Sequence, residues 1–237
     1  MTISILSVTQ PEPELKMTAE ELVIFAARVS NPAGQYNHWS APKLIYHMIR
    51  EKHWSPFDMV DITMEVNTTR DISRQMIRHR SFCVQEFSQR YADPTTALGF
   101  TTREARLQDT KNRQNSIELE DNPANKELRE QWLVRLQAVI NYARFTYDWG
   151  KDRGIAKEQL RAVLPEGLTM SRLYFKGSLR SWMHYCQVRM HPSTQKEHRE
   201  IAVAAWALLE TKFPVIIPAC NVRFAKEKAF EEEYWND

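Results

Sequence analysis

Apolar residues recur along this chain with two different spacings, which predict strands and helices in turn. Residues 60–67 alternate between apolar and polar side chains, a pattern typical of a strand buried on one face. Other segments repeat apolar residues three and four positions apart, as the buried face of a helix requires. The predicted strands are residues 3–8, 60–67, 81–88 and 168–175.

Start signals place the helices between these strands. Thr18 followed by Glu21 forms a capping box. Ser40 is expected to cap a second helix, and Ser193 or Thr194 is expected to cap the last one, which ends near residue 213. The other predicted helices are residues 71–78, 127–149, 156–163 and 178–190.

Residues 91–125 break this regular order. The segment is polar, contains Pro94, Gly99 and Pro123, and shows few periodic signals, so we expect a long excursion ordered by a ligand or a partner subunit. No internal repeat or linker divides the remainder. Strands interrupted by long helices predict one α+β domain over residues 1–237, with a twisted, largely antiparallel sheet flanked by long helices.

The composition restricts the class of protein. A net charge of +2 over 237 residues argues against a nucleic-acid-binding module, which needs a strongly basic surface. The three cysteines, Cys83, Cys186 and Cys220, are widely spaced and form no metal-ligand pair, which favours a reducing intracellular setting. No segment is apolar enough for a membrane span or a secretion signal, so a cytoplasmic protein is expected.

The most concentrated chemistry lies around an Arg-His-Arg run at residues 78–80. Up to three adjacent cations, with Arg90 further on, repel one another unless an anion binds beside them. Guanidinium groups bind phosphate, imide or carboxylate groups through paired hydrogen bonds. Strand alternation would put Glu86 and Ser88 on one face, so we interpret the segment as a ligand-binding edge. A solvated helix end is the simpler alternative for the basic run alone.

Other segments hold possible binding groups near fixed backbone. Pro56 would present Ser55 from a rigid turn, and Arg161 stands just before a proline that stops its helix. Arg180 and His184 are four positions apart on one helix face, where two basic groups favour an external anion or an electron-rich ring. Taken alone, the segment around Ser55 is more simply an ordinary loop, and Arg161 is more simply part of an ordinary helix end.

Together these segments resemble the flavin-dependent thymidylate synthases. Arg-His-Arg at residues 78–80, seven further residues and then Ser88 are similar to the family signature, although Cys83 and Gln85 replace the commoner serine and asparagine. Residues 53–58 resemble the family's His-x-Ser/Thr-Pro-Phe-Glu segment, with aspartate in place of the glutamate. Besides the signature at residues 78–91, the matching segments are residues 53–58, 71–78, 161–165 and 178–201.

The resemblance implies reductive methylation of dUMP to dTMP. It implies 5,10-methylenetetrahydrofolate as carbon donor, FAD as hydride source, NADPH as reductant of the flavin, and a homotetramer with sites between subunits. Arg189 is the expected catalytic group, because a guanidinium can stabilise negative charge at N3 and O4 of the uracil, and no cysteine nucleophile is required. The implied dUMP contacts are Gln75, Arg78, Glu86, Ser88, Arg90, Arg161 and Arg189. The implied FAD contacts are Ser55, Arg78, His79, Arg80, Glu86, Ser178, Arg180 and His184.

Three other readings remain open from the residues. A nucleic-acid-binding module could use the Arg-His-Arg run with aromatic stacking. A metal-dependent hydrolase could use histidines, although none forms a ligand motif and no metal is expected. A relative without activity could retain nucleotide binding alone, and the presence of Arg189 argues against it.

Overall fold

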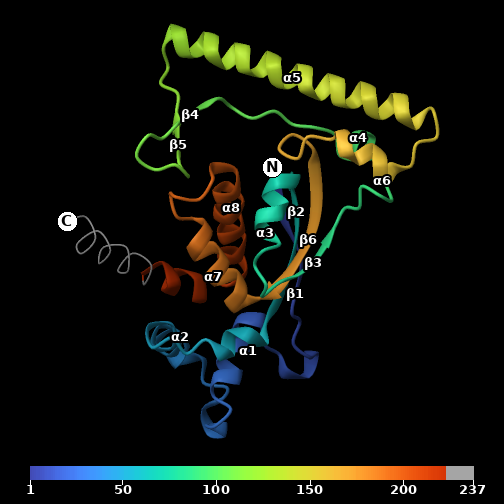
Figure 1. Cartoon of the computed structure of the whole chain (residues 1–237). Helices are drawn as coiled ribbons and strands as arrows, with labels where there is room; N and C mark the ends of the chain where they lie inside the picture. The colour runs from blue at the N-terminus through green and yellow to red at the C-terminus, as the bar shows by residue number, and fades with distance from the viewer. Residues whose placement is uncertain (223–237) are drawn as a thin grey trace.

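A four-stranded antiparallel sheet forms the centre of the computed structural model, which describes residues 1–222 (Figure 1). The strands are β1 (Thr2–Val8), β2 (Asp61–Thr69), β3 (Cys83–Glu86) and β6 (Met170–Ser178), in the order β1-β2-β6-β3. Each neighbouring pair runs antiparallel, so the predicted α+β fold with an antiparallel sheet is confirmed. Residues 223–237 of the predicted domain lie outside the described residues.

The alternation seen in the sequence explains the central strand pair. Met64 and Val66 of β2 are fully buried and lie opposite Phe175 and Leu173 of β6. Apolar side chains in directly opposed positions pack against one another and against the layer that covers that face. The sheet therefore presents one continuous apolar face, and its strands extend along the molecule.

Two helices, α7 and α8, lie beside the sheet, while α5 crosses the far end of the molecule (Figure 1). The main core combines β2 and β6 with residues of α1, α2, α7 and α8, including Val23, Ile45, Trp182 and Ile201. The helices are α1 (Ala19–Ala27), α2 (Ala41–Arg50), α3 (Arg70–Met76), α4 (Pro94–Ala97), α5 (Pro123–Lys151), α6 (Lys157–Leu160), α7 (Leu179–Arg189) and α8 (Lys196–Lys212). No helix in residues 1–222 combines the length and apolar character needed to cross a membrane.

The predicted helix caps are confirmed only in part. The capping box of α1 is present. Ser40 precedes α2, but its Oγ accepts a hydrogen bond from Nη2 of Arg28 at 2.7 Å and caps nothing. The cap predicted at Ser193 or Thr194 is wrong, because α8 begins after Gln195. Side chains that could cap a helix are used in other contacts here.

The signature segment is less regular than predicted. Helix α3 ends at Met76, so Arg78 lies beyond it, and a turn follows in which the N–H of His79 donates to the carbonyl of Met76 at 3.0 Å. Strand β3 pairs with β6 only over Cys83–Glu86, which leaves Ser88 beyond the strand. The run of cations therefore occupies a turn between a helix and an edge strand.

The excursion after this strand has structure of its own. It contains α4 and a two-stranded antiparallel sheet of β4 (Arg106–Gln108) and β5 (Ser116–Glu118). Helix α5 begins at Pro123, before the predicted start at residue 127, because the side chain of Asn122 caps it by accepting from the N–H of Asn125. The helix predicted over residues 156–163 is divided into α6 and a 3-10 turn.

Candidate functional site

The Arg-His-Arg turn presents two cations to solvent. Arg78 and Arg80 are exposed, and within residues 1–222 neither guanidinium forms a hydrogen bond or ion pair. His79, between them, turns inward and is half-buried. An exposed pair of guanidinium groups without partners is suited to an anionic ligand.

His79 holds the guanidinium of Arg189, the last residue of α7. Nε of Arg189 donates to Nε2 of His79 at 2.9 Å. Because a guanidinium can only donate, Nε2 carries no proton and the ring proton lies on Nδ1. Burial, and then the charge of Arg189, lower the pKa of His79, which favours the neutral ring that the hydrogen bond requires. The neutral imidazole thus fixes the direction of Arg189.

Gln75 joins the same cluster through a second histidine. Oε1 of Gln75 lies 3.1 Å from Nδ1 of His198, and Nε2 of His198 lies 3.0 Å from the hydroxyl of Tyr185. The ring of Tyr185 packs edge-on against His79 at 5.0 Å between centroids. Burial, and then the charges of Arg189 and His79, lower the pKa of His198 to about 3. The expected residues Gln75, His79 and Arg189 therefore lie in one cluster.

A second group surrounds the start of α7. Asp58 accepts a hydrogen bond from Oγ of Ser178 at 2.7 Å and from Nη1 of Arg180 at 3.0 Å. Both residues were expected to bind FAD, and the carboxylate that holds them comes from the 3-10 turn Ser55–Met59. The aspartate that replaces the family's glutamate is therefore a direct partner of two expected site residues.

The same group adjoins the Arg-His-Arg turn. Oγ of Ser181 donates to the carbonyl of Ser81 at 3.4 Å, which connects α7 with the residue after the run of cations. The ring of His184 lies edge-on to Trp54 at 4.7 Å, and Ser55 next to Trp54 is exposed. The expected FAD residues on the 53–58 segment, α7 and the turn consequently share one region of the surface.

Glu86 has a different environment from its neighbours in the signature. Its Oε1 accepts hydrogen bonds from the hydroxyls of Ser73 and Ser171 and lies 3.3 Å from Nη1 of Arg70. These partners come from α3, β6 and the start of α3, so the carboxylate joins the edge strand to the rest of the fold. Its expected contacts with nucleotide and FAD remain a prediction.

A pocket of about 450 Å³ lies between α3 and the segment that follows α6. Three arginines line it, Arg70, Arg74 and Arg161, together with Glu158 and Glu166. Nε of Arg74 donates to Glu166 at 2.7 Å. The sequence identified Arg161, but Arg70 and Arg74 were missed as lining residues because their helical spacing is also that of an exposed helix face.

A neighbouring pocket of about 440 Å³ holds the remaining expected residues. Ser88, Arg90 and Glu158 line it, and Nη2 of Arg90 donates to Glu158 at 3.1 Å. Neither of these two pockets is lined by Arg189 or His79. One chain therefore places Gln75 and Arg189 in one group and Ser88, Arg90 and Arg161 around the two pockets, with Glu86 outside both.

Known proteins similar to this chain agree with one another. Residues 15–215 match the family described as thymidylate synthase complementing protein. The flavin-dependent thymidylate synthase of Synechocystis sp. is 43% identical over 223 residues, covering 92% of this chain and 99% of that protein. The probable flavin-dependent thymidylate synthase of Paramecium bursaria Chlorella virus 1 is 40% identical, covering 93% and 99%. The UMP/dUMP methylase PolB from Streptomyces cacaoi shares the fold, with a TM-score of 0.79, 24% identity, and 93% and 94% of the two chains covered.

Proposed function

Because this chain belongs to the flavin-dependent thymidylate synthase family, we propose that it methylates dUMP to dTMP with the residues described above. The observation that supports this most strongly is the pairing of Arg189 with neutral His79, beside the exposed and unpaired Arg78 and Arg80. A directed cation and an open anion site then lie on adjoining parts of one surface.

The residues around the Arg-His-Arg turn fit a flavin dinucleotide. Its diphosphate needs cations without internal partners, which Arg78 and Arg80 supply. Hydroxyl groups at Ser55 and Ser178 and the ring of His184 border the same region. When bound, FAD reduced by NADPH would supply the hydride, with 5,10-methylenetetrahydrofolate supplying the carbon. The full proposed FAD set is that of the family: Ser55, Arg78, His79, Arg80, Glu86, Ser178, Arg180 and His184.

Arg189 is the proposed catalytic residue. Uracil attacks a one-carbon unit from C5, and C5 becomes nucleophilic as negative charge develops at N3 and O4. A guanidinium stays protonated at any working pH and stabilises that charge. Since Nε of Arg189 is engaged by His79, the terminal nitrogens are left to face the nucleotide.

The buried thiol of Cys186 supports a mechanism without a cysteine nucleophile. Cys186, the cysteine nearest to Arg189 in the sequence, is fully buried. Burial raises the pKa of its thiol far above the ordinary value, which disfavours the thiolate that would attack uracil C6. Activation of the ring by an arginine needs no such group.

We assign the nucleotide phosphate to the two pockets lined by arginines. We also propose that the complete site forms only in an assembly of several subunits. Arg161 and Arg90 line two adjoining pockets that Arg189 does not line, so a homotetramer with sites shared between subunits would unite the two groups. Exposed apolar residues on α5, such as Tyr142 and Phe145, supply a surface for that assembly. A cytoplasmic location remains a prediction.

The visible spectrum of the purified protein tests this function. We expect a flavin spectrum that bleaches anaerobically with NADPH, and further when dUMP is present. Arg189→Lys should keep flavin binding but lower the rate of dTMP formation about 10²–10³-fold, since one directed donor group is lost. Arg50→Lys, at an exposed arginine on α2, is the matched control. A colourless protein that takes up no added FAD would contradict the proposal.

A further inference from the structure

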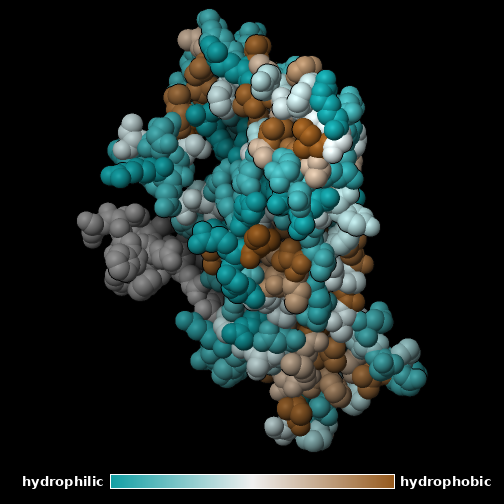
Figure 2. Space-filling model, turned by 45° about the vertical axis from the view of Figure 1, so that its right-hand side comes forward, coloured by the Kyte–Doolittle hydropathy of each residue, from teal (hydrophilic) through white to brown (hydrophobic). Residues whose placement is uncertain are grey.

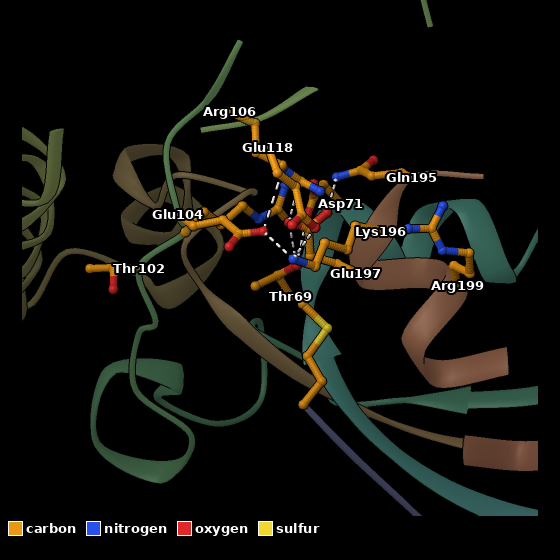
Figure 3. Close-up of polar contacts among 12 residues, drawn as sticks. Thr69, Asp71, Thr102, Glu104, Arg106, Glu118, Gln195, Lys196, Glu197 and Arg199 are labelled. Atoms are coloured by element: carbon orange, nitrogen blue, oxygen red, sulfur yellow. Dashed lines mark hydrogen bonds and ion pairs between the residues drawn. The ribbon is translucent and has the colours of Figure 1, made fainter. Parts of the chain in front are cut away.

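The excursion reaches the proposed site through a buried ion pair. Arg106 of β4 donates through Nη2 to Oε1 of Glu197 in the first turn of α8, and Figure 3 shows the polar contacts around this pair. Both side chains are nearly enclosed, with 11% and 9% of their surfaces exposed. Burial opposes ionisation of Glu197, but hydrogen bonds from Arg106, its own N–H and Gln195 outweigh it and lower the pKa. The carboxylate is therefore charged.

From this ion pair, side-chain hydrogen bonds continue without a break to Gln75. Oε2 of Glu197 accepts from Nε2 of Gln195 at 2.9 Å. Oε1 of Gln195 accepts from Nε2 of Gln75 at 2.8 Å. Oε1 of Gln75 then lies 3.1 Å from Nδ1 of His198, whose Nε2 meets the hydroxyl of Tyr185. These residues, although distant in sequence, thus form one hydrogen-bond network. It runs from Arg106 to Tyr185 and ends beside the cluster around Arg189.

The ion pair at the start of this hydrogen-bond network sets the direction of every hydrogen bond in it. Arginine only donates and a carboxylate only accepts, so Gln195 must turn its NH2 group to Glu197 and its carbonyl to Gln75. Gln75 must then donate to Gln195 and turn its own carbonyl to His198. Neutral His198 can meet a carbonyl only with a proton on Nδ1, which leaves Nε2 to accept from the tyrosine hydroxyl.

We infer that Arg106 and Glu197 are positioning residues that set the amide orientation of Gln75 and the tautomer of His198. The second N–H of the Gln75 amide is then the group offered to the nucleotide, a consequence that rests on the proposed function. The tautomer of His198 does not depend on that function. The excursion thereby acts on the site without touching the substrate.

The substitution Glu197→Gln should reverse the direction of the hydrogen bonds in this network, and it provides the test. Arg106 still requires an oxygen, so the new NH2 group faces Gln195 and reverses both amides, which moves the proton of His198 from Nδ1 to Nε2. Nitrogen and carbon NMR of histidine-labelled protein reads this tautomer directly. We also expect the KM for dUMP to rise about tenfold or more, as a lost hydrogen bond to substrate would cause, with NADPH-driven flavin bleaching without dUMP unchanged.

Two further variants separate the outcomes. Glu118→Gln removes the same charge from a neighbouring carboxylate, which binds Lys196 and takes no part in the network. This variant should leave His198 protonated on Nδ1. If Glu197→Gln does not fold, Gln195→Leu interrupts the hydrogen-bond network instead. A population of His198 with the proton on Nε2 should then appear. A single Nδ1–H tautomer in a folded Glu197→Gln or Gln195→Leu protein would overturn the inference. If the unsubstituted protein has no synthase activity but Glu197→Gln still changes the tautomer of His198, the hydrogen-bond network is supported and the proposed function is rejected.

Discussion

Helices α8 and α5 have similar apolar patterns and opposite surroundings. Over its 17 residues α8 buries seven, among them Ile201, Ala205 and Leu209 in the main core. Over its 29 residues α5 buries five, and Tyr142 and Phe145 on it are 74% and 68% exposed. Figure 2 shows hydrophobic residues gathered at the upper end of the molecule, where α5 lies in Figure 1.

The contrast separates a helix that supports the site from one that faces outward. The first turn of α8 carries Glu197 and His198, which are held by the core beneath them. Helix α5 carries none of the expected site residues. A helical repeat identifies the apolar face of a helix, but it does not say which partner covers that face.

The largest difference should appear between a core side chain and an exposed side chain of α8. Leu209→Ala in α8 leaves a cavity in the main core, and we expect the free energy of unfolding to fall by about 2–5 kcal/mol. Val203→Ala, at an exposed position of the same helix, should change it by less than about 0.5 kcal/mol. Urea denaturation measures both values. Equal losses would show that α8 is not the buried helix described here.

A charge on α5 should disturb assembly where the same charge on α8 does not. We expect Phe145→Glu to place an unpaired carboxylate in the proposed subunit contact and to raise the dissociation concentration at least about tenfold, equivalent to about 1.4 kcal/mol. Light scattering after size-exclusion chromatography would then show a lower molar mass. Val203→Glu on α8 is the control and should keep the mass of the unchanged protein. An unaltered mass for Phe145→Glu argues that α5 is not an interface.

Acid should destabilise the fold through α8. The folded pKa of His198 is about 3 and the ordinary value is 6.5, so between these pH values the unfolded chain binds more protons. The stability contribution is complete above about pH 6.5 and is lost as pH falls toward 3, with a slope up to about 1.4 kcal/mol per pH unit. His198→Gln should remove this part of the slope, whereas His191→Gln, at an exposed histidine, should retain it. Equal slopes in urea titrations would reject the assignment.

The smallest effect is expected at a tyrosine of α5. Tyr147 is fully buried, and its hydroxyl has no hydrogen-bond partner within residues 1–222. Tyr147→Phe removes an unsatisfied polar group, so the free energy of unfolding should stay constant or rise by up to about 1 kcal/mol. Tyr185→Phe in α7 is the opposite case, because it removes a hydroxyl bonded to His198, and should cost about 1–3 kcal/mol. A loss for Tyr147→Phe as large as that for Tyr185→Phe would show that its hydroxyl is bonded.

The site was predictable where it is written in short stretches. Local spacing singled out Arg78–Arg80 and the helix α7, although not the turn that holds the arginines. His79 and Arg189 do meet, and Gln75 joins them through His198. Arg70 and Arg74 were missed because a lining arginine and a solvated one have the same helical spacing. Arg106 was missed because the excursion shows few periodic signals.

The sequence by itself determined the buried alternation of β2, the capping box of α1 and the membership of the family. These depend on neighbours within a few residues, whose backbone geometry is regular. Only the tertiary structure decided that Ser40 serves Arg28 instead of its own helix, and that Arg106 meets Glu197 across 91 positions. Contacts between residues so far apart depend on how elements pack, and packing leaves no local repeat in the chain.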